Sequence, residues 1–507
     1  MLSRSGRRPL WLFGVCVLAG GALLGTWLLA SRSGSAVSAV GQEHARTGAQ
    51  LLPESAIRGS GPVTAYLPFV ARNYDGEPSI FGVEIEVGVV SATVSQAQQA
   101  GVSWVRYNGL LWSEVEAEPE IRDWSKVASF EQEIRLLSER GLTPVVVVRS
   151  APQWAQKVEG TFCGPIREDA LDEFASFMGE VVARYSGPPY NVKYWELGNE
   201  PDVDPVLVPP DNVFGCWGDE ADTYYGGEYY GQMLKRAYGP IKEADPSARV
   251  VLGGLLLVCD PTGPNPAPGT DGCRPAKFLE GVLRAGGGAA FDILAYHAYT
   301  QWVAGYPDRD WDLTQGHWEH RGGALLGKLD YVREVMARYG VSKPVLMNEG
   351  GLICNASDSN PSDCLLEEFR SAQSSHLIKL YARAWANGLI GSAWYTLNGP
   401  GWRQGGLLDE NQDPRDPYYA LSFMAHLLET SHYSRQLASG TFEGYAFADP
   451  VARREYRVYW TNNGSKVFLP LPAGTVAVYS RYGQDITPAG GSVSVGSKPV
   501  FVEMTGP

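Results

Sequence analysis

The stretch VKYWELGNEP (192–201) guides the interpretation of the whole chain. Its first residues are rich in β-branched and aromatic side chains, which favours a strand. Gly198 then leads into Asn199, Glu200 and Pro201. Because proline cannot donate to a strand ladder, the strand must end here. The sequence therefore predicts that a carboxylate, Glu200, stands at the rim of a sheet rather than in its core.

Seven other short apolar runs share this character and alternate with longer amphipathic segments. Strands that alternate with helices are typical of a sheet of parallel strands, and eight of them predict an α/β fold, the (β/α)₈ TIM barrel. A doubly wound sheet is the alternative, but no glycine-rich phosphate turn follows the first predicted strand. The predicted strands are residues 81–86, 102–108, 143–148, 192–198, 249–254, 291–297, 344–349 and 392–397.

The helices between these strands are predicted from apolar residues spaced three and four positions apart. This spacing places the apolar side chains on one face, which then packs against the sheet. The clearest predicted helices are residues 130–140, 171–185, 331–339 and 377–385, followed by a last one at 418–429.

The 507-residue chain is long enough for one large domain and one small domain. Residues 1–30 carry an apolar run behind three arginines and predict a signal peptide or a membrane anchor. Residues 31–75, rich in Ser, Gly, Ala and Pro, predict a linker, and residues 76–430 the barrel. Period-two alternation between glycine turns predicts a small antiparallel β module, similar to a β-sandwich, at residues 431–507.

The N-terminal arginines predict an extracytoplasmic protein, because positive residues stay on the inner side of the membrane. The body is then secreted, or anchored to the membrane by an N-terminal helix that is not cleaved. The formal net charge of −14 argues against nucleic acid as a partner.

Six cysteines follow the N-terminal segment, and an even number in an exported chain favours disulfides. Unpaired buried thiols are the alternative. Proximity along the chain favours the pairs Cys259–Cys273 and Cys354–Cys364, which leaves Cys163–Cys216.

A second stretch, PVLMNEGG (344–351), also ends a predicted strand in Asn-Glu. By strand count, Glu200 closes the fourth strand and Glu349 the seventh, and the carboxyl ends of barrel strands surround one cleft. Two carboxylates across a cleft can hydrolyse a glycosidic bond, one as a protonated acid and the other as an ionised nucleophile. Their repulsion raises the pKa of the more buried one.

With these residues, the chain resembles the large clan of retaining (β/α)₈ glycoside hydrolases. In that clan the acid/base follows an Asn after strand four and the nucleophile ends strand seven. The form WELGNEP is most similar to families 39 and 5, and the resemblance covers about residues 78–430. It implies a glycosidase that cleaves O-glycosidic bonds of a poly- or oligosaccharide by double displacement. Glu200 would be the acid/base and Glu349 the nucleophile, with no cofactor.

The resemblance also implies substrate-binding roles at other strand ends. Asn199 would bind the 2-hydroxyl of the sugar, and Arg106 would hold the nucleophile ionised. His297 and Tyr299 would line the sugar site, and Trp394 would form the floor of the first subsite. Two further tryptophans in loops on this face, Trp154 and Trp402, are candidates for stacking on sugar rings.

Several of these residues have a purely structural alternative. Arg106 could pair with Glu84, Glu86 or Glu196, and Glu196 itself is expected to be structural. His297 could be an ordinary rim histidine and Trp394 a core residue.

Two rival functions remain from the sequence. A non-catalytic carbohydrate-binding barrel on the cell surface would keep the aromatic residues and lose one carboxylate. A metal-dependent hydrolase needs several His or Asp residues at strand ends, and only His297 among seven histidines stands there. We therefore expect no metal.

Overall fold

The computed structural model describes residues 79–506, except 87, 89, 209–211, 213, 214, 264–272, 315, 355–363, 365, 366, 438 and 439. The predicted signal peptide or anchor and the predicted linker, residues 1–75, lie outside the described residues. Contacts divide the chain into two units, Met1–Leu67 and Pro68–Pro507, and every described residue belongs to the second. Within that described part, no helix combines the length and apolar character needed to cross a bilayer.

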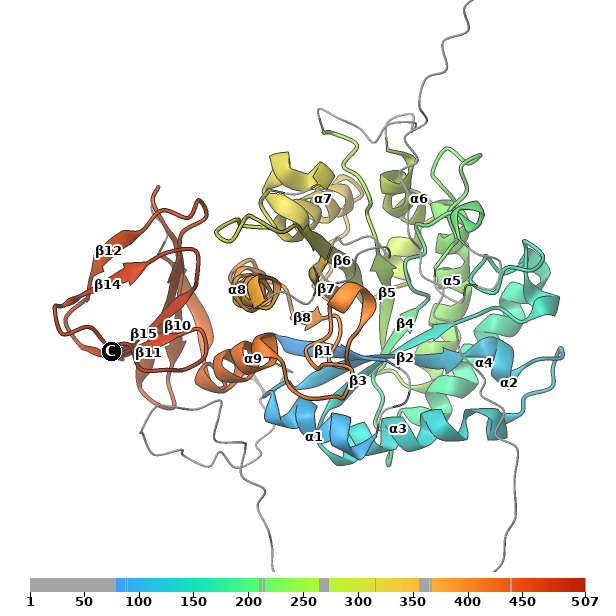
Figure 1. Cartoon of the computed structure of the whole chain (residues 1–507). Coiled ribbons are helices and arrows are strands. Elements are labelled where there is room, and N and C mark those ends of the chain that lie inside the picture. Colours follow the sequence, from blue (N-terminus) through green and yellow to red (C-terminus); the bar gives the residue numbers. More distant parts are fainter. Residues whose placement is uncertain are drawn as a thin grey trace, which may run out of the picture. The chain divides into compact units, whose positions relative to one another are not determined.

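Eight parallel strands close into a barrel in the order β1 to β8 (Figure 1), which confirms the predicted fold class. β1 pairs with both β2 and β8, so the sheet is closed and the doubly wound alternative is excluded. The strands are β1 (Phe81–Ile85), β2 (Trp104–Leu111), β3 (Thr143–Arg149), β4 (Tyr194–Leu197), β5 (Arg249–Leu255), β6 (Ile293–Trp302), β7 (Val345–Cys354) and β8 (Gly391–Trp394).

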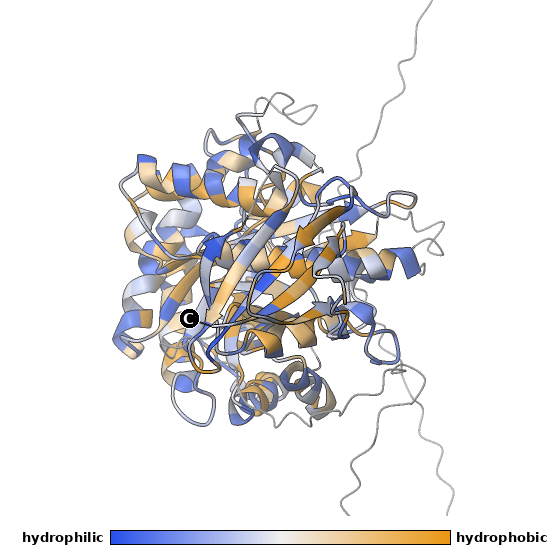
Figure 2. Cartoon of the chain, turned by 90° about the vertical axis from the view of Figure 1, so that its left-hand side faces the viewer, coloured by the Kyte–Doolittle hydropathy of each residue, from blue (hydrophilic) through white to orange (hydrophobic). Residues whose placement is uncertain are grey.

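Helices connect the strands and pack on them with one face. In α4, for example, Phe174, Met178 and Val181 are buried, as their spacing predicts. Hydrophobic and hydrophilic residues alternate along the helices (Figure 2). The α-helices are α1 (Ser91–Gln99), α2 (Trp112–Val115), α3 (Ala128–Glu139), α4 (Leu171–Tyr185), α5 (Gly227–Ala244), α6 (Lys277–Arg284), α7 (Gly323–Arg338), α8 (Glu367–Ala386) and α9 (Asp416–Leu427).

The C-terminal residues form antiparallel sheets, as predicted. Five strands pair in the order β13-β15-β11-β10-β9, and β12 pairs with β14. The domain boundaries themselves stay predictions, because contacts group the barrel and this module into one unit. The strands are β9 (His432–Gln436), β10 (Glu443–Asp449), β11 (Arg454–Trp460), β12 (Val467–Pro470), β13 (Thr475–Ser480), β14 (Ser492–Val495) and β15 (Val500–Thr505).

Helices α8 and α9 both contact the C-terminal module, and α8 supplies a buried ion pair. Arg383 lies 2.7 Å from Glu443 of β10, with both side chains largely buried. The rings of Trp385 and Phe447 lie 5.0 Å apart. Buried ionic and aromatic contacts of this kind are costly to break, so the module forms part of one packed unit with the barrel.

Three disulfides confirm the predicted pairing of the cysteines. Their cysteines lie in the segments that follow β3, β4, β5 and β7, except Cys354, which is the last residue of β7. The bond between residues 163 and 216 joins the segments after β3 and β4. The pairs are Cys163–Cys216, Cys259–Cys273 and Cys354–Cys364.

Candidate active site

Glu200 follows β4 in a constrained backbone turn. Gly198 has φ of 82° and Glu200 itself has φ of 48°, in the left-handed region that residues with a Cβ seldom adopt. The backbone N–H of Glu200 donates to Gly254 O at 3.0 Å, and its carbonyl accepts from Cys216 N at 3.4 Å. These neighbouring segments hold the turn that aims the carboxylate.

Glu200 and Glu349 meet at one point with His297 between them. One carboxylate oxygen of each glutamate and one ring nitrogen of His297 all lie within 4.8 Å of one another. His297 Nδ1 lies 2.8 Å from Glu200 Oε1, and its Nε2 lies 3.5 Å from Glu349 Oε2. The residues that the sequence places on β4, β6 and β7 therefore share a single site.

Glu349 accepts hydrogen bonds on both oxygens. Arg106 Nη1 donates to Oε2 at 2.6 Å, and the Tyr299 hydroxyl donates to Oε1. Both oxygens of Glu349 are therefore engaged by donors, and one of these donors is a buried cation.

Arg106 is completely buried within a ring of acceptors. Its Nε and Nη2 donate to the two oxygens of Glu196, each at 2.9 Å, and Nη2 also donates to Asn199 Oδ1 at 2.5 Å. Its Nη1 donates to Glu84 at 2.6 Å. Burial alone would lower the pKa of Arg106, but Glu196, Glu84 and Glu349 raise it well above its ordinary value.

The two glutamates stand in different electrostatic environments. Burial raises the pKa of Glu200 to about 7, against the opposing effect of Arg106. Burial lowers the pKa of His297 to about 4, so its imidazole is neutral near pH 7. A carboxyl group that carries a proton near neutral pH thus faces one that is held by a guanidinium.

Aromatic rings line the site beside Glu349. The ring centroid of Tyr299 lies 5.7 Å from that of Trp402 and 5.9 Å from that of Tyr395, both edge-on. Tyr395 donates from its hydroxyl to Glu86 Oε1 at 2.6 Å. Trp402 is partly exposed next to these tyrosines, and its stacking on a sugar ring stays a prediction.

Trp154 lies in a different cluster. Its ring centroid is 5.4 Å from that of Trp112, and its indole N–H donates to Glu116 O at 3.0 Å. None of the described contacts joins Trp154 to either glutamate or to Tyr299. Its role in sugar stacking is untested.

The expected role of Trp394 as the floor of the sugar site is wrong. Its side chain is 0% exposed. The centroid of its ring lies 6.1 Å from that of His376 of α8, and its indole N–H donates to Gly405 O at 2.8 Å. Successive side chains along a strand point to opposite faces. Trp394 therefore points toward the helices, whereas Tyr395, the next residue, reaches the site.

Three donor atoms of this cluster, from Glu200, His297 and Glu349, are close enough together to be considered as metal ligands. Both oxygens of Glu349 are already engaged by Arg106 and Tyr299. A divalent cation would have to displace a guanidinium 2.6 Å away, which opposes its binding through like-charge repulsion. The donor set fits acid–base chemistry better than metal binding.

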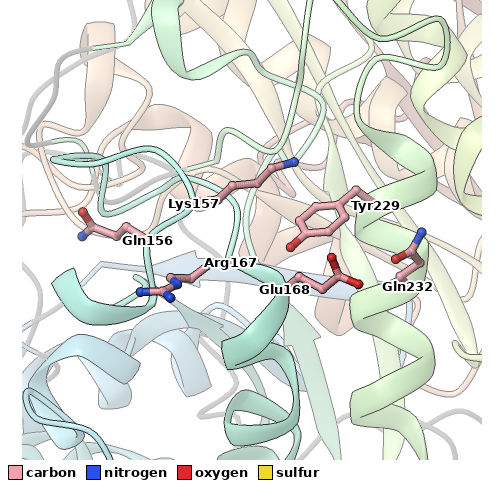
Figure 3. A pocket seen from close by; sticks show the side chains of 6 residues that line it. All are labelled: Gln156, Lys157, Arg167, Glu168, Tyr229 and Gln232. Carbon is pink, nitrogen blue, oxygen red and sulfur yellow. The ribbon is translucent and has the colours of Figure 1, made fainter.

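A second hollow, of about 610 Å³, lies between the segment after β3 and helix α5 (Figure 3). Tyr229 is its aromatic side chain, but the Lys157 ammonium lies 4.0 Å above the ring. The Tyr229 hydroxyl donates to Ile166 O at 2.6 Å. The ring face is thus covered, and the hollow shows no convergent set of groups for a ligand.

Sequence patterns did not assign four residues near the site. Tyr395 could have been found, because it follows Trp394 directly in the predicted strand 392–397. Asn348 donates to Glu196 Oε2 at 2.8 Å and belongs to the quoted Asn-Glu pair. Lys328 on α7 and Asp202 after β4 gave no signal, since their importance depends on contacts between distant segments.

No family model and no curated protein matches the chain. Solved structures do share its architecture. A family 39 glycoside hydrolase from the gut symbiont Bacteroides cellulosilyticus has 18% identity and a TM-score of 0.63, with 84% of this chain and 81% of that chain covered. A GH30 endoxylanase from Clostridium papyrosolvens has 12% identity and a TM-score of 0.54, with 86% and 98% covered.

A monomeric β-xylosidase from Caulobacter crescentus has 15% identity and a TM-score of 0.54, with 84% of this chain and 96% of that chain covered. At these identities the likeness establishes the fold and leaves the activity to be argued from the site. The resemblance to the (β/α)₈ glycoside hydrolases, family 39 among them, is confirmed at the level of the fold.

Proposed function

We propose that the chain is a retaining glycoside hydrolase that cleaves O-glycosidic bonds by double displacement, with Glu349 as nucleophile and Glu200 as acid/base. The observation that carries this proposal is the close approach of the two carboxylates, whose oxygens lie within 4.8 Å. Retaining enzymes place their carboxyl groups about 5–5.5 Å apart, whereas inverting enzymes leave about 6.5–9.5 Å for a water molecule. The short spacing supports direct attack on the sugar.

In the first step, a Glu349 oxygen attacks the anomeric carbon, and the bond from that carbon to the leaving oxygen breaks. Glu200 gives its proton to the leaving oxygen, which departs as an alcohol. In the second step, Glu200 takes a proton from water as the water oxygen attacks the anomeric carbon. The ester bond to Glu349 then breaks, and both carboxyl groups return to their starting states.

The surroundings of each group support this division of roles. The side chain of Glu200 is 21% exposed, and its partial burial raises its pKa to about 7, so it carries the proton that the first step needs. Arg106 and Tyr299 each donate a hydrogen bond to Glu349 and hold its carboxyl group in place. Asn199 accepts from Arg106 with its oxygen, which orients its amide nitrogen as a donor for the sugar 2-hydroxyl.

The substrate would be a poly- or oligosaccharide outside the cytoplasm. The three structurally similar proteins are named as a family 39 glycoside hydrolase, an endoxylanase and a β-xylosidase. The three disulfides support an oxidising, extracytoplasmic location. No cofactor is needed, because proton transfer and carboxylate attack complete the reaction. The presence of both carboxylates in one site speaks against a barrel that only binds sugars.

A panel of aryl glycosides tests the proposal, with wild type, Glu200→Ala and Glu349→Ala assayed in parallel. We expect Glu349→Ala to lose activity on every substrate. Glu200→Ala should lose much less activity on dinitrophenyl glycosides, whose leaving groups depart without a proton. Equal rates for all three proteins on every sugar would rule out the proposed roles.

Azide distinguishes the two carboxylates by the configuration of the product. In Glu349→Ala it should replace the nucleophile and give a glycosyl azide of inverted configuration. In Glu200→Ala it should attack the glycosyl-enzyme and give an azide of retained configuration. The opposite pattern would exchange the two roles.

A further inference from the structure

The segment Gly254–Leu257, at the end of β5, is hydrogen-bonded to the turn that carries Glu200. Gly254 O accepts the backbone N–H of Glu200 at 3.0 Å. Asp202, two residues after Glu200, accepts from Leu256 N and Leu257 N, each at 2.8 Å. The backbone that carries the acid/base is therefore attached to this segment on both sides of Glu200.

Lys328 of α7 joins the same segment to the histidine of the site. Its Nζ donates to Leu256 O at 2.7 Å and to His297 O at 2.8 Å. His297 in turn places Nδ1 2.8 Å from Glu200 Oε1. A single ammonium group thus connects the two segments that contact Glu200, one through its backbone and one through its side chain.

Lys328 is 6% exposed and carries its charge without direct pairing. Among the described residues, no carboxylate lies within ion-pair distance of its Nζ. Burial lowers its pKa to about 8, while Asp202, Glu200 and Asp312 oppose that effect. A buried ammonium that only binds carbonyl groups is costly. A methionine of similar shape would fill the space without this cost, so a positive charge at this place calls for a role.

We propose that Lys328 is a positioning residue for the acid/base: it fixes His297 and the segment Gly254–Leu257 around Glu200, and its charge favours proton release from Glu200. This inference rests on the proposed function. A positive charge nearby stabilises the ionised carboxylate, so the second step, in which Glu200 must act as a base, gains from it. The first step needs the protonated form, and the buried position of Glu200 preserves it.

Other charged and titratable groups also act on Glu200. Their contributions are unchanged when Lys328 alone is replaced, so a substitution there isolates its effect. The groups are Arg106 of β2, Glu196 of β4, Asp202 after β4, His297 of β6 and Glu349 of β7.

The test is the pH profile of kcat/KM in Lys328→Met. Removing the positive charge should raise the pKa of Glu200, so the alkaline limb of the profile should move up by about one pH unit. The kcat on dinitrophenyl glycosides, for which the second step limits the rate, should fall about tenfold, and the kcat on substrates with poor leaving groups should fall less. Lys328→Arg keeps the charge, so its alkaline limb should stay in place even if its kcat falls.

Lys379→Met is the matched control, because Lys379 is also buried but contacts Asp310 of a different cluster at 3.0 Å. Lys379→Met should lose stability, but the alkaline limb of its pH profile should stay at the wild-type position. An alkaline limb of Lys328→Met at the wild-type position, or one that moves equally in Lys379→Met, would overturn the inference. If Lys328→Met does not fold, Lys328→Gln gives the same readout. Failure of the proposed function would be seen separately, because Glu200→Ala and Glu349→Ala would then keep the wild-type activity.

Discussion

Arg106 and Glu349 are joined by a buried hydrogen bond of 2.6 Å between Nη1 and Oε2. The same guanidinium lies 2.6 Å from Glu84 and 2.9 Å from Glu196. One cation therefore donates hydrogen bonds to acidic side chains that originate from β1, β4 and β7. It links the interior of the barrel to the rim, where the chemistry is proposed to occur.

Replacement of Arg106 should damage both folding and activity. In Arg106→Met, three buried acidic side chains lose their hydrogen-bond donor, and we expect about 3–5 kcal/mol less stability in urea unfolding. Arg106→Lys keeps a positive charge but cannot bond two oxygens of Glu196 together, so its loss should be smaller. An Arg106→Met protein as stable as wild type would contradict this account of the barrel interior.

Removal of the Tyr299 hydroxyl should reduce the rate. A hydrogen bond to a charged group contributes about 1.5–3 kcal/mol, so kcat/KM of Tyr299→Phe should fall by about 10–100-fold. Tyr395→Phe is the control, because Tyr395 lies beside Tyr299 but donates to Glu86. If both variants lose the same activity, the specific bond from Tyr299 to Glu349 has no special role.

The activity should decline above about pH 7. Glu200 must be protonated for the first step, and burial raises its pKa to about 7, so the active form is lost as pH rises through that value. The measurement is kcat/KM against pH on a substrate with a poor leaving group. Glu200→Gln, assayed on a dinitrophenyl glycoside, should lack this alkaline limb, and a limb that persists there would point to another group.

Loss of the Cys163–Cys216 bond should weaken the turn at Glu200. This disulfide spans 53 residues, and Cys216 N donates to the Glu200 carbonyl. Closing a loop of that length stabilises by about 4 kcal/mol in the chain-entropy estimate. Cys163→Ser with Cys216→Ser should therefore lower the melting temperature and kcat together.

Removal of the Cys354–Cys364 bond is the control for that experiment, because its loop of 10 residues is shorter. It should cost less stability. A larger loss of kcat from this control than from the Cys163–Cys216 variant would argue against the link to Glu200.

Acid should destabilise the fold in part through His376. Burial lowers its pKa to about 3 in the folded state, against an ordinary value of 6.5. The unfolded chain therefore binds a proton between these values that the folded chain does not, so stability falls as pH drops below 6.5. Between pH 6 and 4.5, the free energy of unfolding of His376→Gln in urea titrations should fall by about 1–2 kcal/mol less than that of wild type. Parallel stability curves would show that another group is responsible.

The barrel strands and the disulfides could be predicted because their signals are local. Each strand is a short apolar run that ends in Gly, Pro or a polar residue. Two of the cysteine pairs are close together along the chain, which leaves the third pair. Glu200 and Glu349 were found because strand order brings strand ends to one cleft, and His297 was found because the resemblance implies it.

The misses have equally specific causes. The face on which Trp394 lies depends on a register that differs by one residue from the expected one, and such a shift exchanges the two faces. Lys328 lies within helix α7, and nothing in its neighbours along the chain shows that its ammonium reaches Leu256 and His297. Strands β9, β10 and β14 were not predicted, and β14 is only four residues long.

The left-handed backbone at Glu200 sets a limit on improving this protein. A glycine there would relieve about 1 kcal/mol of conformational strain, and would also remove the carboxyl group. A search for heat-resistant variants that does not measure turnover would therefore select a more stable but inactive protein at this position. Any such screen needs a readout of catalysis at every round.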